Sequence, residues 1–286
     1  MRPCHQVEIV TPKKIRLNGI WYGSYAPKRV IVFIHGLSGS VFSKTDLMQV
    51  LAVSGTGVLV FNNRGHDRVS SITSITGKRI IAGAAHEVFE ECVDDIDGAI
   101  SFAKQFHVPV YLMGSSTGCQ KISHWAYKRK KGTAGLILLA PISDFSAELM
   151  LTGRHKLDQW KKMARILIQK GRQHTLVPIP NPKWEFVVDA QRFMSLYSGK
   201  SAEEIFTYWE PKRASKTLRS IKIPTLVLLA EKDEYAERSV DKISSWFEAN
   251  IQTGEVIVVP RVTHNFKTAE KQVAGYIRRF MKESLM

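Results

Sequence analysis

Short apolar runs alternate along this chain with longer amphipathic segments, and this rhythm constrains the fold more than any other feature. The runs lie at residues 30–34, 57–61, 108–113, 135–140, 225–230 and 255–259. Runs of this length suit strands that are buried on both faces, and segments with helical periodicity separate most of them. Strand–helix alternation is typical of a mostly parallel sheet that helices cover on both sides. We therefore expect an α/β fold.

Other segments complete this expectation. Val7 to Tyr25 is predicted to form two antiparallel strands, with breaks at Thr11-Pro12 and Asn18-Gly19. Helices are expected near residues 44–54, 85–106, 117–131, 236–249 and 268–281. The second of these helices is acidic, and we expect its carboxylates to form a solvated face. These carboxylates are Glu87, Glu90, Glu91, Asp94, Asp95 and Asp97.

The rhythm stops between residues 144 and 218. This span has helical patterns near 157–169, 187–197 and 202–209, with a proline-rich joint at 178–182. We expect a helical insertion at 144–218 and a core made of residues 1–143 and 219–286. Five aromatic residues of the insertion are candidates for lining a pocket beneath it. They are Trp160, Trp184, Phe193, Tyr208 and Trp209.

Ser116 lies in the sequence Gly114-Ser115-Ser116-Thr117-Gly118, directly after the apolar run at 108–113. A serine in a sharp strand-to-helix turn projects its hydroxyl clear of the sheet, and flanking glycines let strand and helix approach closely. The amides and dipole at the start of the next helix would face negative charge that develops on a substrate. The setting predicts that Ser116 is a nucleophile.

A nucleophilic serine needs a base, and His264 is the only histidine after His174. His264 follows the last apolar run, and Asp233 follows the run before it by three residues. We expect His264 to take the proton from Ser116 and return it to the leaving group. Asp233 would fix the imidazole tautomer and stabilise the imidazolium.

The identity of the acid has alternatives in the sequence. Asp144 follows the apolar run at 135–140, and Glu231 and Glu234 are neighbours of Asp233 that could also reach the imidazole. The chain order serine, acid, histidine, with the acid after the later strand, favours Asp233.

A second turn can supply the electrostatic part of such a site. The sequence His35-Gly36-Leu37-Ser38-Gly39 follows the apolar run at 30–34. A turn at this point can present the backbone N–H of Leu37 beside that of Thr117. Two such donors would hold the oxyanion of a tetrahedral intermediate.

These motifs together resemble the alpha/beta-hydrolase family, in its serine esterase and lipase-like branch. The resemblance rests on His35-Gly36-Leu37, Asn63-Arg64-Gly65-His66, the turn around Ser116, Asp233 and His264, and it covers nearly the whole chain. It implies an alpha/beta-hydrolase fold with a helical cap, cleavage of a carboxylic ester through an acyl-enzyme, and no cofactor. Many relatives have histidine where this chain has Ser115, so the resemblance does not extend to the substrate of one subgroup.

The same resemblance leaves other functions open. Thioesterases, amidases and lactonases use the same triad. A catalytically silent binding protein on this fold is an alternative from another class, and so is a basic protein that binds surfaces. The sequence indicates neither the substrate-binding residues nor the oligomeric state.

Charge and composition limit the partners. The chain has 286 residues, 44% of them hydrophobic, and a formal net charge of +15, which fits one domain with a substantial core. Basic residues gather in the insertion, where they could attract an anionic ester or an anionic membrane surface, although a solvated basic face is the simpler interpretation. They are Arg154, Lys156, Lys161, Lys162, Arg165, Lys170 and Arg172. No nucleic-acid-binding motif accompanies this charge.

Three features favour a cytoplasmic protein. No apolar stretch approaches the roughly 20 residues of a membrane span, and the first residues lack the apolar core of a secretory signal. Cys4, Cys92 and Cys119 cannot all pair with one another. No histidine or cysteine spacing indicates a metal site, so we expect none.

Overall fold

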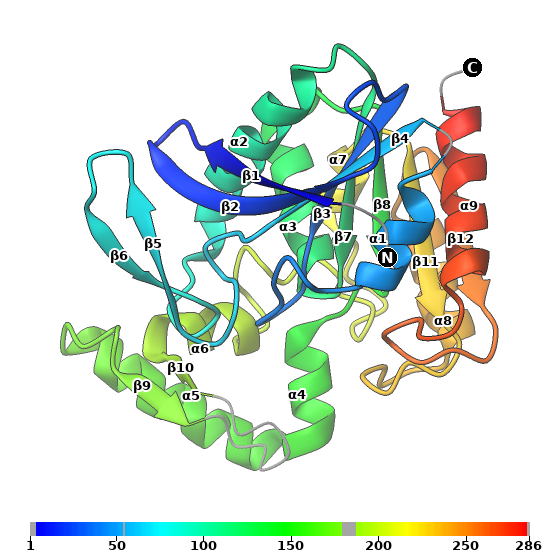
Figure 1. Ribbon diagram of the computed structural model, residues 1–286. Helices are drawn as coiled ribbons and strands as arrows, with labels where there is room; N and C mark the ends of the chain where they lie inside the picture. Colours follow the sequence, from blue (N-terminus) through cyan, green and yellow to red (C-terminus); the bar gives the residue numbers. More distant parts are fainter. Residues whose placement is uncertain (1–3, 54, 179–186, 285–286) are drawn as a thin grey trace.

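The computed structural model describes residues 4–53, 55–178 and 187–284. Within these residues, ten strands form one sheet in the order β12-β11-β8-β7-β3-β4-β2-β5-β6, with β1 paired to β2 (Figure 1). The strands are β1 (Cys4–Val10), β2 (Ile15–Tyr22), β3 (Arg29–Ile34), β4 (Thr56–Phe61), β5 (Ser70–Ser74), β6 (Arg79–Ala82), β7 (Val110–Ser115), β8 (Gly135–Leu139), β11 (Thr225–Ala230) and β12 (Gly254–Val259). Neighbours from β12 to β4 run parallel, whereas β1, β2, β5 and β6 pair antiparallel. The predicted mostly parallel sheet is confirmed.

Helices cover both faces of the sheet, as the alternation of segments predicted. Those outside the β8–β11 connection are α1 (Thr45–Leu51), α2 (Cys92–Lys104), α3 (Thr117–Arg129), α8 (Val240–Glu248) and α9 (Glu270–Glu283), and the single turn η1 (Phe89–Glu91) precedes α2. Val30, Val32 and Ile34 of β3 pack in one cluster with residues of α2, α3 and α8. Ile31 and Phe33 pack in the other, with residues of α1 and α9. Residues 30–34 of β3 thus pack alternately in one core and the other, and Figure 1 shows the helices on the two faces of the sheet.

Between β8 and β11 the chain leaves the sheet. It forms α4 (Asp144–Thr152), α5 (Arg154–Gln169), the strand pair β9 (Leu176–Pro178) and β10 (Val187–Asp189), α6 (Ala190–Tyr197) and the short α7 (Lys216–Ser220). All but α7 lie together below the sheet in Figure 1. These elements have a hydrophobic cluster of their own, which includes Leu157, Val188 and Phe193. We refer to α4, α5, β9, β10 and α6 as the cap.

Three predictions of local structure were wrong. Asn18-Gly19 lies inside β2 rather than at a break. The glycine is needed there because β4 passes so close that a Cβ on Gly19 would lie 2.9 Å from the carbonyl oxygen of Val60. The pattern at 187–197 begins as β10 before it becomes α6. Residues 202–209 form turns rather than a helix, because the apolar residues there pack into the main core, as Phe206 does. Beyond Pro178, the proline-rich joint lies outside the described residues.

The acidic stretch also differs from expectation. Helix α2 begins only at Cys92, and the side chains of Glu87, Asp94 and Asp95 are buried rather than solvated. Each of them contacts a buried cation: Arg64 pairs with Asp94 and Asp95, and Lys121 pairs with Glu87. Helical periodicity cannot distinguish a solvated acidic face from one that meets buried partners.

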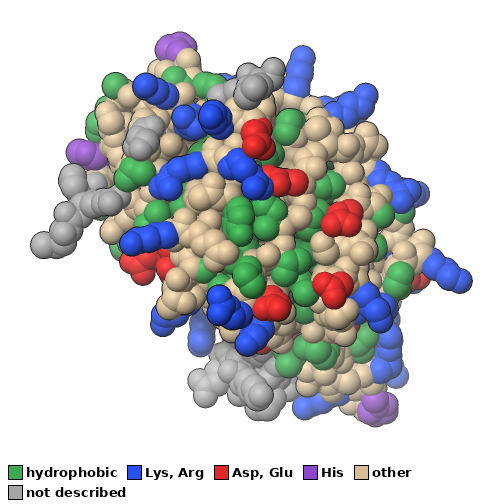
Figure 2. All heavy atoms as spheres, turned by 90° about the vertical axis from the view of Figure 1, so that its right-hand side faces the viewer, with side chains coloured by type: hydrophobic (Ala, Val, Ile, Leu, Met, Phe, Trp, Pro, Cys, Tyr) green, Lys and Arg blue, Asp and Glu red, His purple; other side chains and the backbone are tan. Residues whose placement is uncertain are grey.

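The described helices include none that is both long and apolar enough to cross a membrane. On the face that Figure 2 shows, Lys and Arg side chains are spread over the surface with Asp and Glu between them. One of the basic residues of the cap is not on a solvated face: Lys161 is buried, pairs with Asp158 at 2.7 Å and lies 5.5 Å from the centre of the Phe145 ring.

Candidate active site

Ser116 lies between the end of β7 and the start of α3, at the predicted strand-to-helix turn. Its backbone has φ 55° and ψ −125°, a strained conformation for a residue with a side chain. Two glycines make the turn possible. A Cβ on Gly114 would lie 2.4 Å from the carbonyl oxygen of Gly118, and one on Gly118 would lie 2.3 Å from that of Ile34. The sequence thus forces a sharp turn that leaves the Ser116 side chain at a cavity.

His264 and Asp233 meet at the same edge of the sheet, on the loops after β12 and β11. The distance from His264 Nδ1 to Asp233 Oδ2 is 2.8 Å. A carboxylate can only accept, so Nδ1 carries the proton and Nε2 is left as the basic nitrogen. Glu234 accepts a hydrogen bond from the His264 backbone N–H at 3.0 Å, and the Tyr235 ring stands edge-on to the imidazole at 4.8 Å. The loop therefore fixes both the position and the tautomer of the imidazole.

The alternative acids are engaged elsewhere. Asp144 Oδ2 accepts a hydrogen bond from the side chain of Gln120 at 2.8 Å. Burial and the nearby charge of Glu203 raise the pKa of Asp144 well above its usual range, which disfavours the negative charge that a histidine partner needs. Glu231 accepts from the backbone N–H of Arg261 at 2.6 Å. The geometry therefore favours Asp233 among the candidates.

A cavity of about 480 Å³ brings Ser116, His264 and Leu37 together. Its lining contains the charged or phenolic side chains Lys44, Arg68, Asp144, Glu148, Tyr197 and Tyr235. In the part of the chain that the structure describes, no hydrogen bond joins Ser116 Oγ to the His264 ring. Catalytic hydrogen bonds of this kind often tighten only when substrate is bound.

Two backbone N–H groups of the predicted site make no hydrogen bond to the described part of the protein. Among the described residues, neither the Leu37 N–H nor the Thr117 N–H donates a hydrogen bond to a protein acceptor. Leu37 lines the cavity, and Thr117 is the residue after Ser116 at the N-terminus of α3. The first N–H groups of a helix have no partner within it, and those of Leu37 and Thr117 are free to donate to a ligand.

His35 holds the turn that carries Leu37. Its Nδ1 donates to the carbonyl oxygen of Gly36 at 2.9 Å. Burial, with a smaller effect from the Lys121 charge, lowers the pKa of His35 to about 3, so the ring stays neutral. A Cβ on Gly36 would lie 3.0 Å from the Ser116 Cβ. His35 and Gly36 thus set the distance between the turn and the serine.

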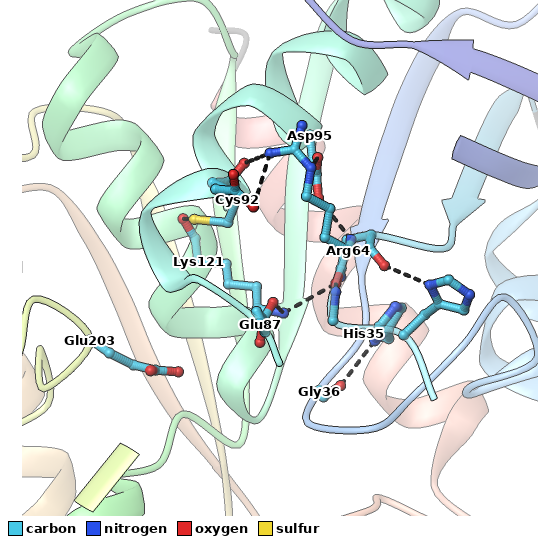
Figure 3. Close-up of polar contacts among 12 residues, drawn as sticks. His35, Gly36, Arg64, Glu87, Cys92, Asp95, Lys121 and Glu203 are labelled. Atoms are coloured by element: carbon cyan, nitrogen blue, oxygen red, sulfur yellow. Dashed lines mark hydrogen bonds and ion pairs between the residues drawn. The ribbon is translucent and has the colours of Figure 1, made fainter. Parts of the chain in front are cut away.

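A network of buried charges lies next to this turn (Figure 3). Glu87 contacts Lys121 Nζ at 2.5 Å and Arg192 Nη2 at 2.8 Å, and Arg192 also pairs with Glu203. Lys121 donates to Asn63 at 3.2 Å. We call Glu87, Lys121, Arg192 and Glu203 the ion cluster. It joins α3 of the core to α6 of the cap, and the sequence patterns gave no signal that these charges would be buried together.

The predicted pocket-lining aromatic residues are not at the cavity. Of the four that the structure describes, Phe193 and Tyr208 are buried in hydrophobic clusters, and Trp160 and Trp209 pack partly buried against such clusters. Trp184 lies outside the described residues. The cavity wall on the cap side comes instead from α4, through Ala147, Glu148 and Leu151, and from Tyr197 of α6.

Comparison with known proteins gives a consistent picture. A family model described as "Protein of unknown function (DUF1749)" matches residues 84–281. "Phospholipase YtpA" of Bacillus subtilis (strain 168) is 25% identical over 231 residues, which are 77% of this chain and 81% of that protein.

Solved structures with similar folds include a siderophore hydrolase, EstB, from Aspergillus fumigatus, with a TM-score of 0.70, 15% identity and coverage of 100% of this chain and 98% of that one. A thermostable carboxyl esterase from Bacillus coagulans has a TM-score of 0.69 and 13% identity, and each chain is covered completely. The alpha/beta hydrolase GrgF from Penicillium sp. sh18 has a TM-score of 0.69 and 14% identity, with 99% of this chain and 100% of that one covered. The likeness shows the alpha/beta-hydrolase fold and confirms the fold predicted from the sequence.

Proposed function

Because the chain belongs to the DUF1749 family and has the alpha/beta-hydrolase fold, we propose that it is a serine hydrolase that cleaves a carboxylic ester through an acyl-enzyme at Ser116. Its esterase, lipase-like and phospholipase-named relatives support hydrolase activity. One observation carries the finer proposal. Ser116, His264 and Leu37 line one cavity, Asp233 bonds the Nδ1 of His264, and neither the Leu37 nor the Thr117 N–H donates to an acceptor among the described residues.

In the proposed reaction, Ser116 Oγ attacks the ester carbonyl carbon while His264 Nε2 takes the hydroxyl proton. The carbonyl oxygen becomes an oxyanion that accepts hydrogen bonds from the Leu37 and Thr117 N–H groups. Collapse of this intermediate breaks the bond to the alcohol oxygen, which receives the proton from His264. Water then attacks the acyl-enzyme with His264 again as base, which releases the acid and restores Ser116.

The charges at the cavity favour an anionic or uncharged polar substrate. Lys44 donates to the backbone of Asn265 at 2.9 Å, and burial lowers its pKa to about 8, so most of it is charged at neutral pH. Burial raises the pKa values of Asp144 and Glu148, which disfavours their negative forms. The positive charge of Lys44 is therefore balanced by less negative charge than the number of acidic residues in the cavity lining suggests.

Hydrolysis of p-nitrophenyl esters from acetate to palmitate, with folded Ser116→Ala as control, tests the proposal. We expect activity in the wild type, loss of it in the variant, and a chain-length optimum that reflects the cavity volume. Equal background rates in folded wild type and Ser116→Ala on every ester would reject ester hydrolysis and leave a thioester or amide substrate, or a binding role.

A second candidate substrate is a phospholipid at an anionic membrane. Helix α5 exposes the apolar side chains of Met163, Ile166 and Ile168 beside the exposed cations Lys162 and Arg165, a combination that suits interfacial contact. Co-sedimentation with anionic and with zwitterionic vesicles tests this: we expect salt-sensitive binding to the anionic ones, and no binding to either would exclude it.

A further inference from the structure

Three side chains of types that commonly bind metal ions meet at the boundary between core and cap, outside the cavity that Ser116 lines. They are His86 in the turn before η1, His174 between α5 and β9, and Asp189 at the end of β10. The Asp189 Oδ2 lies 3.2 Å from His86 Nδ1 and 3.0 Å from His174 Nδ1. One ligand atom from each residue lies within 4.8 Å of the others. Asp189 is 103 residues from His86 and 15 from His174, so no spacing in the sequence could have revealed the group.

The backbone around these side chains is fixed by hydrogen bonds that do not involve the side chains. The Asp189 N–H donates to the Ala85 carbonyl at 2.8 Å, next to His86. The Ala190 N–H donates to the Thr175 carbonyl at 3.0 Å, next to His174. The three segments therefore hold the donor atoms together before any ligand arrives, which lowers the ordering cost of binding.

The Asp189 carboxylate is suited to hold a cation. It has no solvent exposure, and its Oδ1 accepts from the Arg192 N–H at 2.8 Å, as the outer partners of a metal-ligating carboxylate do. The Arg192 guanidinium does not neutralise it, because that group pairs with Glu87 and Glu203. Apart from the two imidazoles, the described residues offer no ion-pair partner to Asp189.

The donor set and its dimensions match a small tetrahedral ion. Zinc binds histidine nitrogen and aspartate oxygen at about 2.0–2.2 Å, so two ligands of a tetrahedron lie roughly 3.3 Å apart. The two nitrogen–oxygen distances of 3.2 and 3.0 Å are close to that edge. Binding requires each neutral imidazole to move its proton from Nδ1 to Nε2, which frees Nδ1 without a change in charge. The His174 side chain is 64% exposed and gives an entry path from solvent.

We propose that His86, His174 and Asp189 form a binding site for a divalent transition-metal ion of the zinc type, which fastens the cap to the core. The donor atoms are of the kinds that zinc prefers. They come from three segments that backbone hydrogen bonds already hold side by side. A bound ion stabilises the connection between β10 of the cap and the turn before η1, because it binds the folded arrangement and not the unfolded chain.

The test uses the full chain with Cys4→Ser, because Cys4 is exposed and adjacent to His5 and could bind zinc by itself. Metal-free protein is titrated with zinc chloride by calorimetry. His174→Ala removes an exposed ligand with little risk to folding, and His155→Ala, another exposed histidine of the cap, is the matched control. We expect one zinc per chain, affinity at least about tenfold weaker in His174→Ala, and unchanged affinity in His155→Ala.

Two further measurements sharpen the result. Zinc should raise the melting temperature of the parent and of His155→Ala but not of His174→Ala, and His86→Gln should behave like His174→Ala. Cobalt(II) should give the intense visible absorption of a tetrahedral site in the parent and in His155→Ala, but not in His174→Ala or His86→Gln. Absence of zinc binding in the parent, or equal binding by His174→Ala, would overturn the proposal and leave the three side chains as a hydrogen-bonded group.

Discussion

The ion cluster and the site around Ser116 are both polar regions in the interior of the molecule, and they use their polar groups in opposite ways. In the ion cluster, the carboxylates of Glu87 and Glu203 face the cations of Lys121 and Arg192. Around Ser116, the Leu37 and Thr117 N–H groups and the serine hydroxyl have no acceptor among the described residues. In the ion cluster the polar groups pair with one another, whereas around Ser116 these groups are left to bind a ligand.

This difference separates buried polar groups that stabilise the fold from polar groups that are available to bind a substrate. Breaking a buried ion pair strands a charge and destabilises the fold. Removing a polar group that has no partner within the protein should change the free energy of unfolding little, but it removes a contact that a substrate would have made. Changes in the two regions should therefore affect different measurements.

The largest effect is expected from Asp233→Asn. An amide at this position favours the wrong imidazole tautomer, so we predict a fall in kcat for ester hydrolysis of about ten-thousand-fold. The melting temperature should change by a few degrees at most, because Asp233 lies on a surface loop, with 14% of its side chain exposed to solvent. Steady-state kinetics and thermal unfolding of the same preparation measure both.

Asp144→Asn is the matched control for this variant, since Asp144 lines the cavity that Ser116 and His264 also line. We expect less than a tenfold change in kcat. If Asp144→Asn were the more damaging of the two, the acid would have to be reassigned to Asp144 at the start of α4.

Glu87→Gln should affect the other measurement. It leaves the buried cations Lys121 and Arg192 without their shared carboxylate, and we predict a loss of about 3–5 kcal/mol in the free energy of unfolding. Urea unfolding measures it, and the exposed Glu90 provides a Glu90→Gln control that should stay within about 0.5 kcal/mol of the wild type. Lost ester hydrolysis at unchanged stability would contradict the division between the two regions.

A smaller effect is expected where the two regions share the backbone of α3. Gly118→Ala places a Cβ 2.3 Å from the Ile34 carbonyl oxygen, and we predict a loss of about 1–3 kcal/mol in the free energy of unfolding. Gly275→Ala, in α9 with nothing within 4 Å of its Cβ, should instead gain about 0.5–1 kcal/mol. Urea unfolding of the pair compares them, and equal values would show that the turn relaxes freely.

The smallest effect concerns pH. The unfolded chain binds a proton at His35 below about pH 6.5, whereas the folded ring, with a pKa of about 3, stays neutral. The contribution of His35 to the free energy of unfolding should therefore fall by about 1 kcal/mol between pH 7.5 and pH 5.5. Burial also lowers the pKa of His124, which acts in the same direction, whereas burial raises the pKa values of Asp95 and Glu204 to about 7, which acts in the opposite direction.

Urea unfolding of the wild type and of His35→Asn at the two pH values checks this: the free energy of unfolding of the wild type relative to the variant should be about 1 kcal/mol lower at pH 5.5 than at pH 7.5. A difference between the two proteins that does not change with pH would show that His35 takes up a proton in the folded state.

Much of the fold was predictable from the sequence because its signals are local. The apolar runs became β3, β4, β7, β8, β11 and β12, and the glycines around Ser116 marked the turn. The β5–β6 hairpin was missed because its strands are short and largely exposed, so they lack the apolar runs that marked the others.

The rest of the site depends on contacts between segments far apart in the chain. The sequence predicts a solvated Glu87 because nothing near it in the chain shows that Lys121 and Arg192 will lie beside it. The cavity wall from α4 and the group of His86, His174 and Asp189 were missed for the same reason. Periodicity reports which face of an element is apolar, but it does not report what the polar face will meet.

The most direct test of the central claim is labelling with a fluorophosphonate probe, followed by mass spectrometry of the peptides. We expect one label on Ser116 in the wild type, none in folded Ser116→Ala, and retained labelling in Ser115→Ala, which removes only the neighbouring serine. No labelling of folded wild-type protein, or a label that persists in Ser116→Ala, would contradict the proposal that this cavity activates Ser116.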